Sequence, residues 1–159
     1  MTFEIREATT LDLPRIVDLN DPIQRQHAAA YPSDFLYPTV PNDVSDFFET
    51  LLSDESQKVI LATLGDETVA YLWYGIERQR PSPFKRSVDR LFVRHIFVCS
   101  EYRRQGVATL LLEHVQAAAA KDGHDEIALD AWAVNDDAQA FFTSQGFDVY
   151  RLFFRKRLS

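Results

Sequence analysis

The chain has 159 residues, 46% of them apolar and 26% charged, which suits one globular domain with a sizeable core. Its 17 Lys and Arg residues against 24 Asp and Glu residues give a net charge of −7, which disfavours general nucleic-acid binding. The single cysteine, Cys99, excludes an intrachain disulfide, and we expect a cytoplasmic protein because no signal peptide or membrane-spanning run is visible.

The first half of the sequence predicts a strand, two helices and a β-hairpin. These elements are expected, in order, at residues 3–8, 11–19, 43–52, and 58–64 with 68–76. Asn42 is the expected cap of the second helix. The segment between the helices, residues 21–41, contains four prolines and is expected to be irregular.

The second half alternates strands and helices. The expected elements are a strand at 88–98, a helix at 106–121, a strand at 126–132, a helix at 136–145 and a last strand at 147–158. The whole order is β-α-α-β-β-β-α-β-α-β. It predicts a single domain over residues 1–159 of the α/β (α+β) kind, with a mixed sheet and helices on both faces.

A possible phosphate site follows the strand at 88–98. The sequence Arg103-Arg104-Gln105-Gly106 leads into a helix, whose first N–H groups have no partner within the helix and favour an anion. Gly106 leaves room for an anion to approach the backbone, and the arginines add positive charge. Taken alone, this short pattern is more typical of an ordinary strand-to-helix turn with solvated arginines.

Two motifs together resemble the GNAT superfamily of acetyl-CoA-dependent N-acetyltransferases. Arg103-x-x-Gly106-x-Ala108 resembles the Q/R-x-x-G-x-G/A signature of that family. The family's N-x-x-A-x-x-F-Y-x-x-x-G-F block is matched by a run that begins at Asn135 and ends at Phe147. The resemblance implies a GNAT-like fold, in which the fourth and fifth strands splay apart and the pantetheine arm of the cofactor lies between them.

The same resemblance implies a set of residues that bind acetyl-CoA, the co-substrate. The fourth strand would pair with the pantetheine arm, the loop and helix start would hold the pyrophosphate, and the later block would complete the site. The implied residues are Ile96, Phe97, Val98, Arg103, Arg104, Gln105, Gly106, Val107, Ala108, Thr109, Asn135, Ala138, Phe141 and Phe142. Asn135 would also serve as a helix N-cap. No histidine pair has the spacing of metal ligands, so no metal is expected.

The implied reaction is direct attack of a primary amine on the thioester in a ternary complex. The usual tyrosine acid of the family is replaced by Phe142, and the fourth strand has no carboxylate between residues 91 and 98. Candidates for the general base are therefore His95, Glu77 or a solvent-linked water. Cys99 is expected to be structural, because direct transfer needs no enzyme nucleophile.

Several functional alternatives remain open at this stage. A GNAT-fold domain that binds acyl-CoA without turnover would also fit, as would an interaction module that binds no nucleotide. The acceptor is a small-molecule amine or a peptide or protein amine, and no nucleic-acid or membrane partner is expected. The aromatic segment at 147–158 could extend the sheet of a second copy, so a homodimer is possible.

Overall fold

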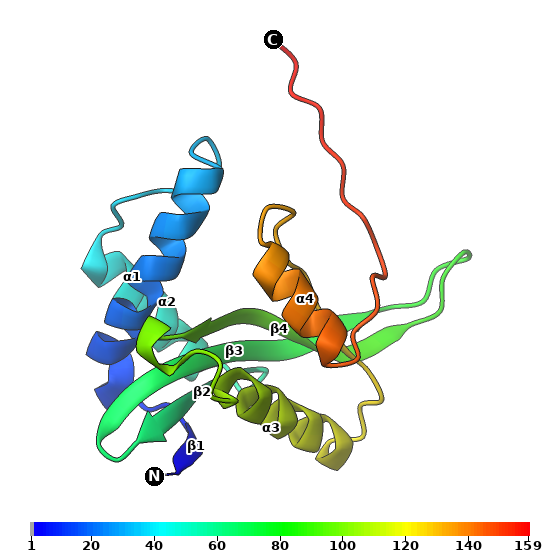
Figure 1. The fold of residues 1–159 in the computed structure, drawn as a ribbon. Helices are drawn as coiled ribbons and strands as arrows, with labels where there is room; N and C mark the ends of the chain where they lie inside the picture. Colours follow the sequence, from blue (N-terminus) through cyan, green and yellow to red (C-terminus); the bar gives the residue numbers. More distant parts are fainter. Residues whose placement is uncertain (1) are drawn as a thin grey trace.

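The computed structural model describes residues 2–159, which form one sheet and four α-helices (Figure 1). The elements are β1 (Phe3–Glu7), α1 (Leu13–Ala30), α2 (Pro41–Leu52), β2 (Gln57–Leu64), β3 (Glu67–Gln79), β4 (Val88–Val98), α3 (Val107–Lys121), β5 (Ile127–Leu129) and α4 (Asp136–Ser144). Single 3-10 turns precede α1 and follow β4. No helix in residues 2–159 has both the length and the apolar character needed to cross a bilayer.

The five strands form one mixed sheet in the order β1-β2-β3-β4-β5. Neighbouring strands are antiparallel except for β4 and β5, which are parallel. Helices α1 and α2 cover one face of the sheet, and α3 and α4 cover the other (Figure 1). Side chains of α1 and α2 pack around the fully buried Tyr71, and those of α3 and α4 pack around Leu72 and Leu111. Strand β2 supplies both cores by alternation, because Val59 and Leu61 face one and Ile60 and Ala62 the other. The predicted mixed sheet with helices on both faces is confirmed.

Strands β4 and β5 pair over only three residues. The pairing runs from Leu91 with Ile127 to Val93 with Leu129, and it ends there although β4 continues to Val98. At the paired end, Arg90 contacts the carboxylates of Glu77 and Glu126 at 3.0 and 2.6 Å, and these ion pairs hold the strands together. The predicted separation of the fourth and fifth strands is therefore present.

A β-bulge in β4 decides which residues face each core. Trp73 pairs with His95 and Tyr74 with Val93, so Arg94 has no partner on β3. The extra residue reverses the alternation, because a one-residue shift moves every later side chain to the opposite face. Val93 packs against the α3 side, whereas Phe97, also at an odd position, packs against α1 and α2.

Two predictions about the first helices are wrong. Helix α1 does not stop near residue 19 but continues through Pro22 to Ala30, so much of the expected irregular segment is helical. Its buried stripe, which includes Ile16, Leu19 and the half-buried Ile23, compensates for the hydrogen bond that a proline removes. Helix α2 begins at Pro41 with Val40 as its N-cap residue, so Asn42 lies inside the helix instead of capping it.

The last predicted strand, at 147–158, does not form. Phe147 packs against the core, but the residues after it pair with no strand among residues 2–159. Figure 1 shows this segment leaving α4 and extending away from the sheet. The strand expected at 126–132 is also shorter than predicted, since only residues 127–129 pair with β4. The helices expected at 106–121 and 136–145 are confirmed within one residue at each end. The hairpin is confirmed as well, although its second strand continues three residues further than predicted, to Gln79.

Candidate functional site

The loop between β4 and α3 has the backbone of an anion-binding nest. Arg104 and Gly106 adopt left-handed φ angles of 61° and 82°, which is unusual for arginine. Among residues 2–159, no acceptor contacts the six successive backbone N–H groups from residue 104 to residue 109. Successive N–H groups in such a loop, at the positive end of a helix dipole, attract a polyanion. The loop therefore fits the pyrophosphate that its sequence suggests.

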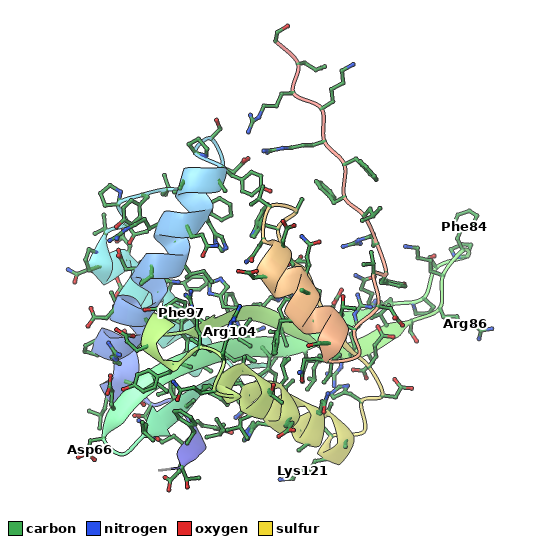
Figure 2. The ribbon with its side chains drawn as sticks, in the orientation of Figure 1. Asp66, Phe84, Arg86, Phe97, Arg104 and Lys121 are labelled. Atoms are coloured by element: carbon green, nitrogen blue, oxygen red, sulfur yellow. The ribbon has the colours of Figure 1, made fainter. Side chains whose placement is uncertain are left out.

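Side chains around the loop leave its centre open. Arg103 Nε donates to the carbonyl oxygen of Val98 at 3.1 Å, which ties the loop to the end of β4. A Cβ atom built on Gly106 would meet nothing within 4 Å. Figure 2 shows Arg104 in this loop, beside the end of β4 that carries Phe97. Val107 is buried and anchors the start of α3, whereas Arg104 and Gly106 are exposed.

The far half of β4 has a backbone edge that faces the gap left by β5. Cys99 N–H donates to Val69 O, so the polar backbone groups of Cys99 point toward β3. Because neighbouring residues in a strand alternate, those of Val98 and Ile96 point the opposite way. Within residues 2–159, no strand pairs with that side of β4 beyond Val93. An extended amide-containing arm can pair with this edge as an added strand would.

The second motif, which runs from Asn135 to Phe147, includes helix α4 and lies across the gap from the far half of β4. Asn135 caps α4, since its Oδ1 accepts from the backbone N–H of Ala138 at 3.1 Å. The ring of Phe142 is buried among the α3-side core, with the rings of Phe141 and Phe147 at 5.6 and 5.9 Å. The capping role predicted for Asn135 is therefore confirmed, and its Nδ2 remains free to donate to a ligand.

His95 lies on the α1–α2 side of the sheet in a hydrogen-bonded chain. The amide of Asn20 donates to the buried hydroxyl of Tyr71 at 3.1 Å, and that hydroxyl is 3.1 Å from His95 Nδ1. Asn20 Nδ2 can only donate, so among these partners Nδ1 of His95 is the acceptor available to the hydroxyl proton, and this assignment places the ring proton on Nε2. Burial, reinforced by nearby His27, lowers the pKa of His95 to about 4, so the ring is neutral at physiological pH.

The two other titratable candidates lie in different surroundings. Both carboxylate oxygens of Glu77 accept from Arg90, at the paired end of β4 roughly 15 Å along the sheet from His95. Cys99 is half-buried next to Arg15, whose Nη2 lies 3.8 Å from Sγ. Burial raises the pKa of this thiol, which disfavours the thiolate. The structure brings His95 to the α1–α2 face but leaves Glu77 apart from it.

A cluster of four aromatic rings joins the end of α1 to the loop before α4. The ring centroid of Trp132 lies 5.0 Å from those of Tyr31 and Phe35 and 6.0 Å from that of His27. The sequence predicted an irregular segment at 21–41, and nothing in it indicated that Trp132 packs against Tyr31 and Phe35. Among residues 2–159, no group of three acidic, histidine or cysteine side chains is arranged to hold a metal ion.

Comparison with known proteins gives consistent matches. Residues 20–147 match the acetyltransferase (GNAT) family. The chain is 30% identical over 115 residues to N-acetyltransferase 8 of Homo sapiens. The alignment covers 72% of this chain and 49% of that relative, so this chain spans about half the length of the relative.

Two solved structures share the fold. The tetramutant of the BH1408 protein from Bacillus halodurans is 20% identical, with a TM-score of 0.88 and coverage of 98% and 99% of the two chains. An aminoglycoside antibiotic 6'-N-acetyltransferase from Acinetobacter baumannii is 23% identical, with a TM-score of 0.76 and coverage of 99% and 100%.

Proposed function

The chain belongs to the acetyltransferase (GNAT) family, and from this premise we propose that it transfers an acetyl group from acetyl-CoA to a primary amine. The observation that carries the proposal is the run of six unpaired N–H groups at residues 104–109, placed beside an open strand edge. A nest for a diphosphate next to an edge for an amide-containing arm matches the chemistry of CoA at both ends.

The proposed cofactor contacts follow the geometry of the two motifs. The loop from Arg103 through Thr109 holds the pyrophosphate by backbone N–H groups and by the charge of Arg104. Ile96 and Val98 offer backbone groups to the pantetheine arm, with Phe97 supporting the strand from the other face. Asn135 Nδ2 donates to that arm, while Ala138, Phe141 and Phe142 form the α4 side of the channel. Bound acetyl-CoA supplies the activated thioester.

The residues of the chain favour direct transfer. The neutral acceptor amine attacks the thioester carbonyl carbon, so that an N–C bond forms and the C–S bond breaks with release of the CoA thiolate. The proton that the nitrogen then loses passes to this thiolate or to water. The outward N–H of Val98 donates to the carbonyl oxygen as negative charge develops there. In the tautomer set by Tyr71, Nδ1 of His95 accepts a hydrogen bond and Nε2 carries the ring proton. Neither ring nitrogen then has a free lone pair for the amine proton, which supports water as its acceptor. The general base predicted at His95 or Glu77 stays a prediction.

The test is an acceptor screen with acetyl-CoA in which release of free thiol is followed. Small amines, amino acids, aminoglycosides and lysine peptides cover the classes of acceptor that the sequence left open. Mass spectrometry of the acceptor must show an added acetyl group. If acetyl-CoA binds by calorimetry but no acceptor is modified, the alternative of a CoA-binding domain without turnover gains support. Phe142 at the position of the usual acid is the observation that favours this alternative.

We expect the pH dependence to identify the proton acceptor. For a lysine-like amine with pKa ~10.4, kcat/KM is expected to rise about tenfold per pH unit between about pH 7 and 9, because the neutral amine fraction rises at that rate. His95, with its pKa of about 4, stays neutral over this range and adds no inflection. His95→Gln should therefore keep the slope. A plateau in the wild type that this variant removes would instead identify His95 as the general base.

We expect Cys99→Ala to keep most of the transferase activity. Direct attack needs no acetyl-enzyme, and burial raises the pKa of the thiol so that little thiolate exists at neutral pH. Alanine removes only a half-buried sulfur atom beside Arg15. The measurements are turnover and intact mass after incubation with acetyl-CoA alone. A stable mass increase of one acetyl group that disappears in Cys99→Ala would contradict direct transfer.

A further inference from the structure

Aromatic rings gather in two groups, one around His95 on β4 and one at the end of α1. The ring centroids of Trp73 and Phe48 lie 4.8 and 6.4 Å from that of His95. The second group is the aromatic cluster described above, which consists of His27, Tyr31, Phe35 and Trp132. In this cluster Trp132 is 43% exposed and Phe35 is half-buried, so both rings keep surface on which a ligand can pack.

Helix α1 connects the two groups along one of its faces. Its buried Asn20 donates to the hydroxyl of Tyr71, which contacts His95. His27 follows Asn20 after about two turns and Tyr31 follows after about one more, so these three side chains share a face. The two histidines also lie near enough that the charge of His27 contributes to the low pKa of His95. An aromatic surface therefore extends from His95 through the cluster.

This aromatic surface begins near the proposed position of the thioester. His95 precedes Val98 on β4 by three residues, which is roughly 10 Å along the strand. Among residues 2–159, Nε2 of His95 has no hydrogen-bond partner, yet no fully buried side-chain nitrogen or oxygen atom lacks one. Solvent therefore reaches this nitrogen. An amine that attacks the thioester near Val98 can place its remaining atoms against the aromatic surface.

The charged groups beside the cluster disfavour a second positive charge on a ligand. Residues 21–37 contain two carboxylates, and each is already neutralised by arginine. The ion pairs are Asp21 with Arg25 at 3.1 Å, and Asp34 with Arg155 and Arg157 at 2.7 and 3.3 Å. The guanidinium of Arg155 also lies 5.9 Å from the ring centroid of Tyr31, so a cation of the chain itself already interacts with this ring. Three arginines against two carboxylates leave the surroundings of the cluster positive.

We propose, on the basis of the transferase function above, that the acceptor is a primary amine on an aromatic body without a second positive charge, and that Phe35 and Trp132 bind this body. Ring–ring contacts stabilise an aromatic ligand beyond the burial of apolar area alone. A second ammonium would lose water here without finding a carboxylate. Burial lowers the pKa of His27 and of His95, whereas a carboxylate close to either ring would raise it. The amine nitrogen gains the acetyl group and loses a proton, and CoA leaves as the thiol.

The first test compares phenylethylamine, cyclohexylethylamine and the diamine cadaverine as acceptors for the full chain with saturating acetyl-CoA. Release of CoA thiol gives kcat/KM, which is expressed per concentration of neutral amine so that differences in amine pKa cancel. Burial of the phenyl ring should favour phenylethylamine over cadaverine by roughly tenfold to a hundredfold. Ring–ring contacts should favour it over cyclohexylethylamine by about two- to tenfold.

Matched variants assign this preference to the cluster. Phe35→Leu and Trp132→Leu keep an apolar side chain but remove a ring. Each should weaken the preference for phenylethylamine over cyclohexylethylamine by about two- to tenfold, and the change should lie in KM rather than in kcat. Phe84→Leu makes the same substitution at the tip of the β3–β4 hairpin, where Phe84 is 94% exposed (Figure 2). This control should leave the preference unchanged.

A binding measurement separates the substrate class from the transfer itself. The chain has two tryptophans, so Trp132→Leu identifies the indole N–H signal of Trp132 in an NMR spectrum. Phenylethylamine, added to the full chain with CoA, should shift this signal until it saturates, and cadaverine should not. If no amine is acetylated but phenylethylamine still shifts the signal, the aromatic site stands and the proposed transferase function fails.

Other results would overturn the aromatic acceptor while leaving transfer intact. One is a kcat/KM for cadaverine that equals or exceeds that for phenylethylamine, in which case a carboxylate such as the exposed Asp130 binds the second ammonium. Another is a preference for phenylethylamine that both leucine variants of the cluster retain in full. A Trp132 signal that phenylethylamine does not shift, in a chain that acetylates this amine, would likewise show that the ring binds elsewhere.

Discussion

Replacing Gly106 with glutamate is expected to abolish acetyl-CoA binding in a chain that still folds. The φ angle of 82° strains any L-residue there, at a cost of about 1–2 kcal/mol, but no neighbour lies within 4 Å of the new Cβ. The new carboxylate would stand over the N–H groups of residues 104–109. Like charges about 4 Å apart repel by about 4 kcal/mol at an effective dielectric constant of ~20, or about a thousandfold in affinity.

The matched control for this variant is Gly123→Glu. Gly123 follows the other end of α3, has a φ angle of 80° and also has open space around its Cβ position. Both variants therefore carry similar backbone strain and the same added charge, but that charge is favourable at the N-terminus of α3 and unfavourable after its C-terminus, so Gly123→Glu should melt at the lower temperature. Only Gly106→Glu should lose binding of acetyl-CoA by calorimetry. Equal binding by a folded Gly106→Glu variant would show that the pyrophosphate site is elsewhere.

The sequence predicted the local structure of the loop between β4 and α3, the proposed cofactor side, better than the surroundings of His95, the proposed acceptor side. Residues 98–109 are contiguous, and a strand, a glycine and a helix start are enough to form a nest wherever they occur in that order. Asn135 as a cap is equally local. For the same reason the strand at 88–98 and the helix after it could be placed almost to the residue.

The proposed acceptor side depends on contacts between distant segments. The bulge at Arg94 turns His95 toward Tyr71 and α2, and no local pattern in β4 indicates an unpaired residue there. Helix α1 continues through Pro22 because its apolar stripe packs against the sheet. Intrinsic helix propensity disfavours proline and takes no account of this tertiary packing. The packing of Trp132 against Tyr31 likewise joins residues that are a hundred positions apart. The expected last strand at 147–158 has suitable alternation but pairs with no strand in the described part of the chain, residues 2–159.

Phe142→Ala is expected to destabilise the chain by about 3–5 kcal/mol, because the ring is buried in the α3-side core. The loss removes contacts with the rings of Phe141 and Phe147 and leaves a cavity at the junction of α3 and α4. Acetyl-CoA binding should weaken as well, since the proposed channel loses one wall. Thermal unfolding and calorimetry measure the two effects separately. Unchanged stability would contradict the buried position of this ring.

Phe142→Tyr tests the proposed place of the same ring relative to the sulfur. The ring is kept, so acetyl-CoA affinity should remain nearly unchanged, and the new hydroxyl can protonate the leaving thiolate. General acid catalysis contributes typically ~10²–10⁴-fold where it operates. A CoA thiol with a pKa near that of free cysteine, ~8.5, is already a tolerable leaving group, so turnover should rise by less than this range or stay level.

The control is Phe141→Tyr, which adds the same hydroxyl to the neighbouring, half-exposed ring. Only the change at Phe142 is expected to alter how turnover depends on pH, because only there would the phenol reach the thiolate. A hydroxyl buried without a partner would instead cost about 1–3 kcal/mol of stability. If Phe142→Tyr showed that loss, or lost cofactor binding while folded, the ring would point into the core rather than toward the sulfur. In that case the correspondence between this chain and the family motif at residues 135–147 would need to be shifted.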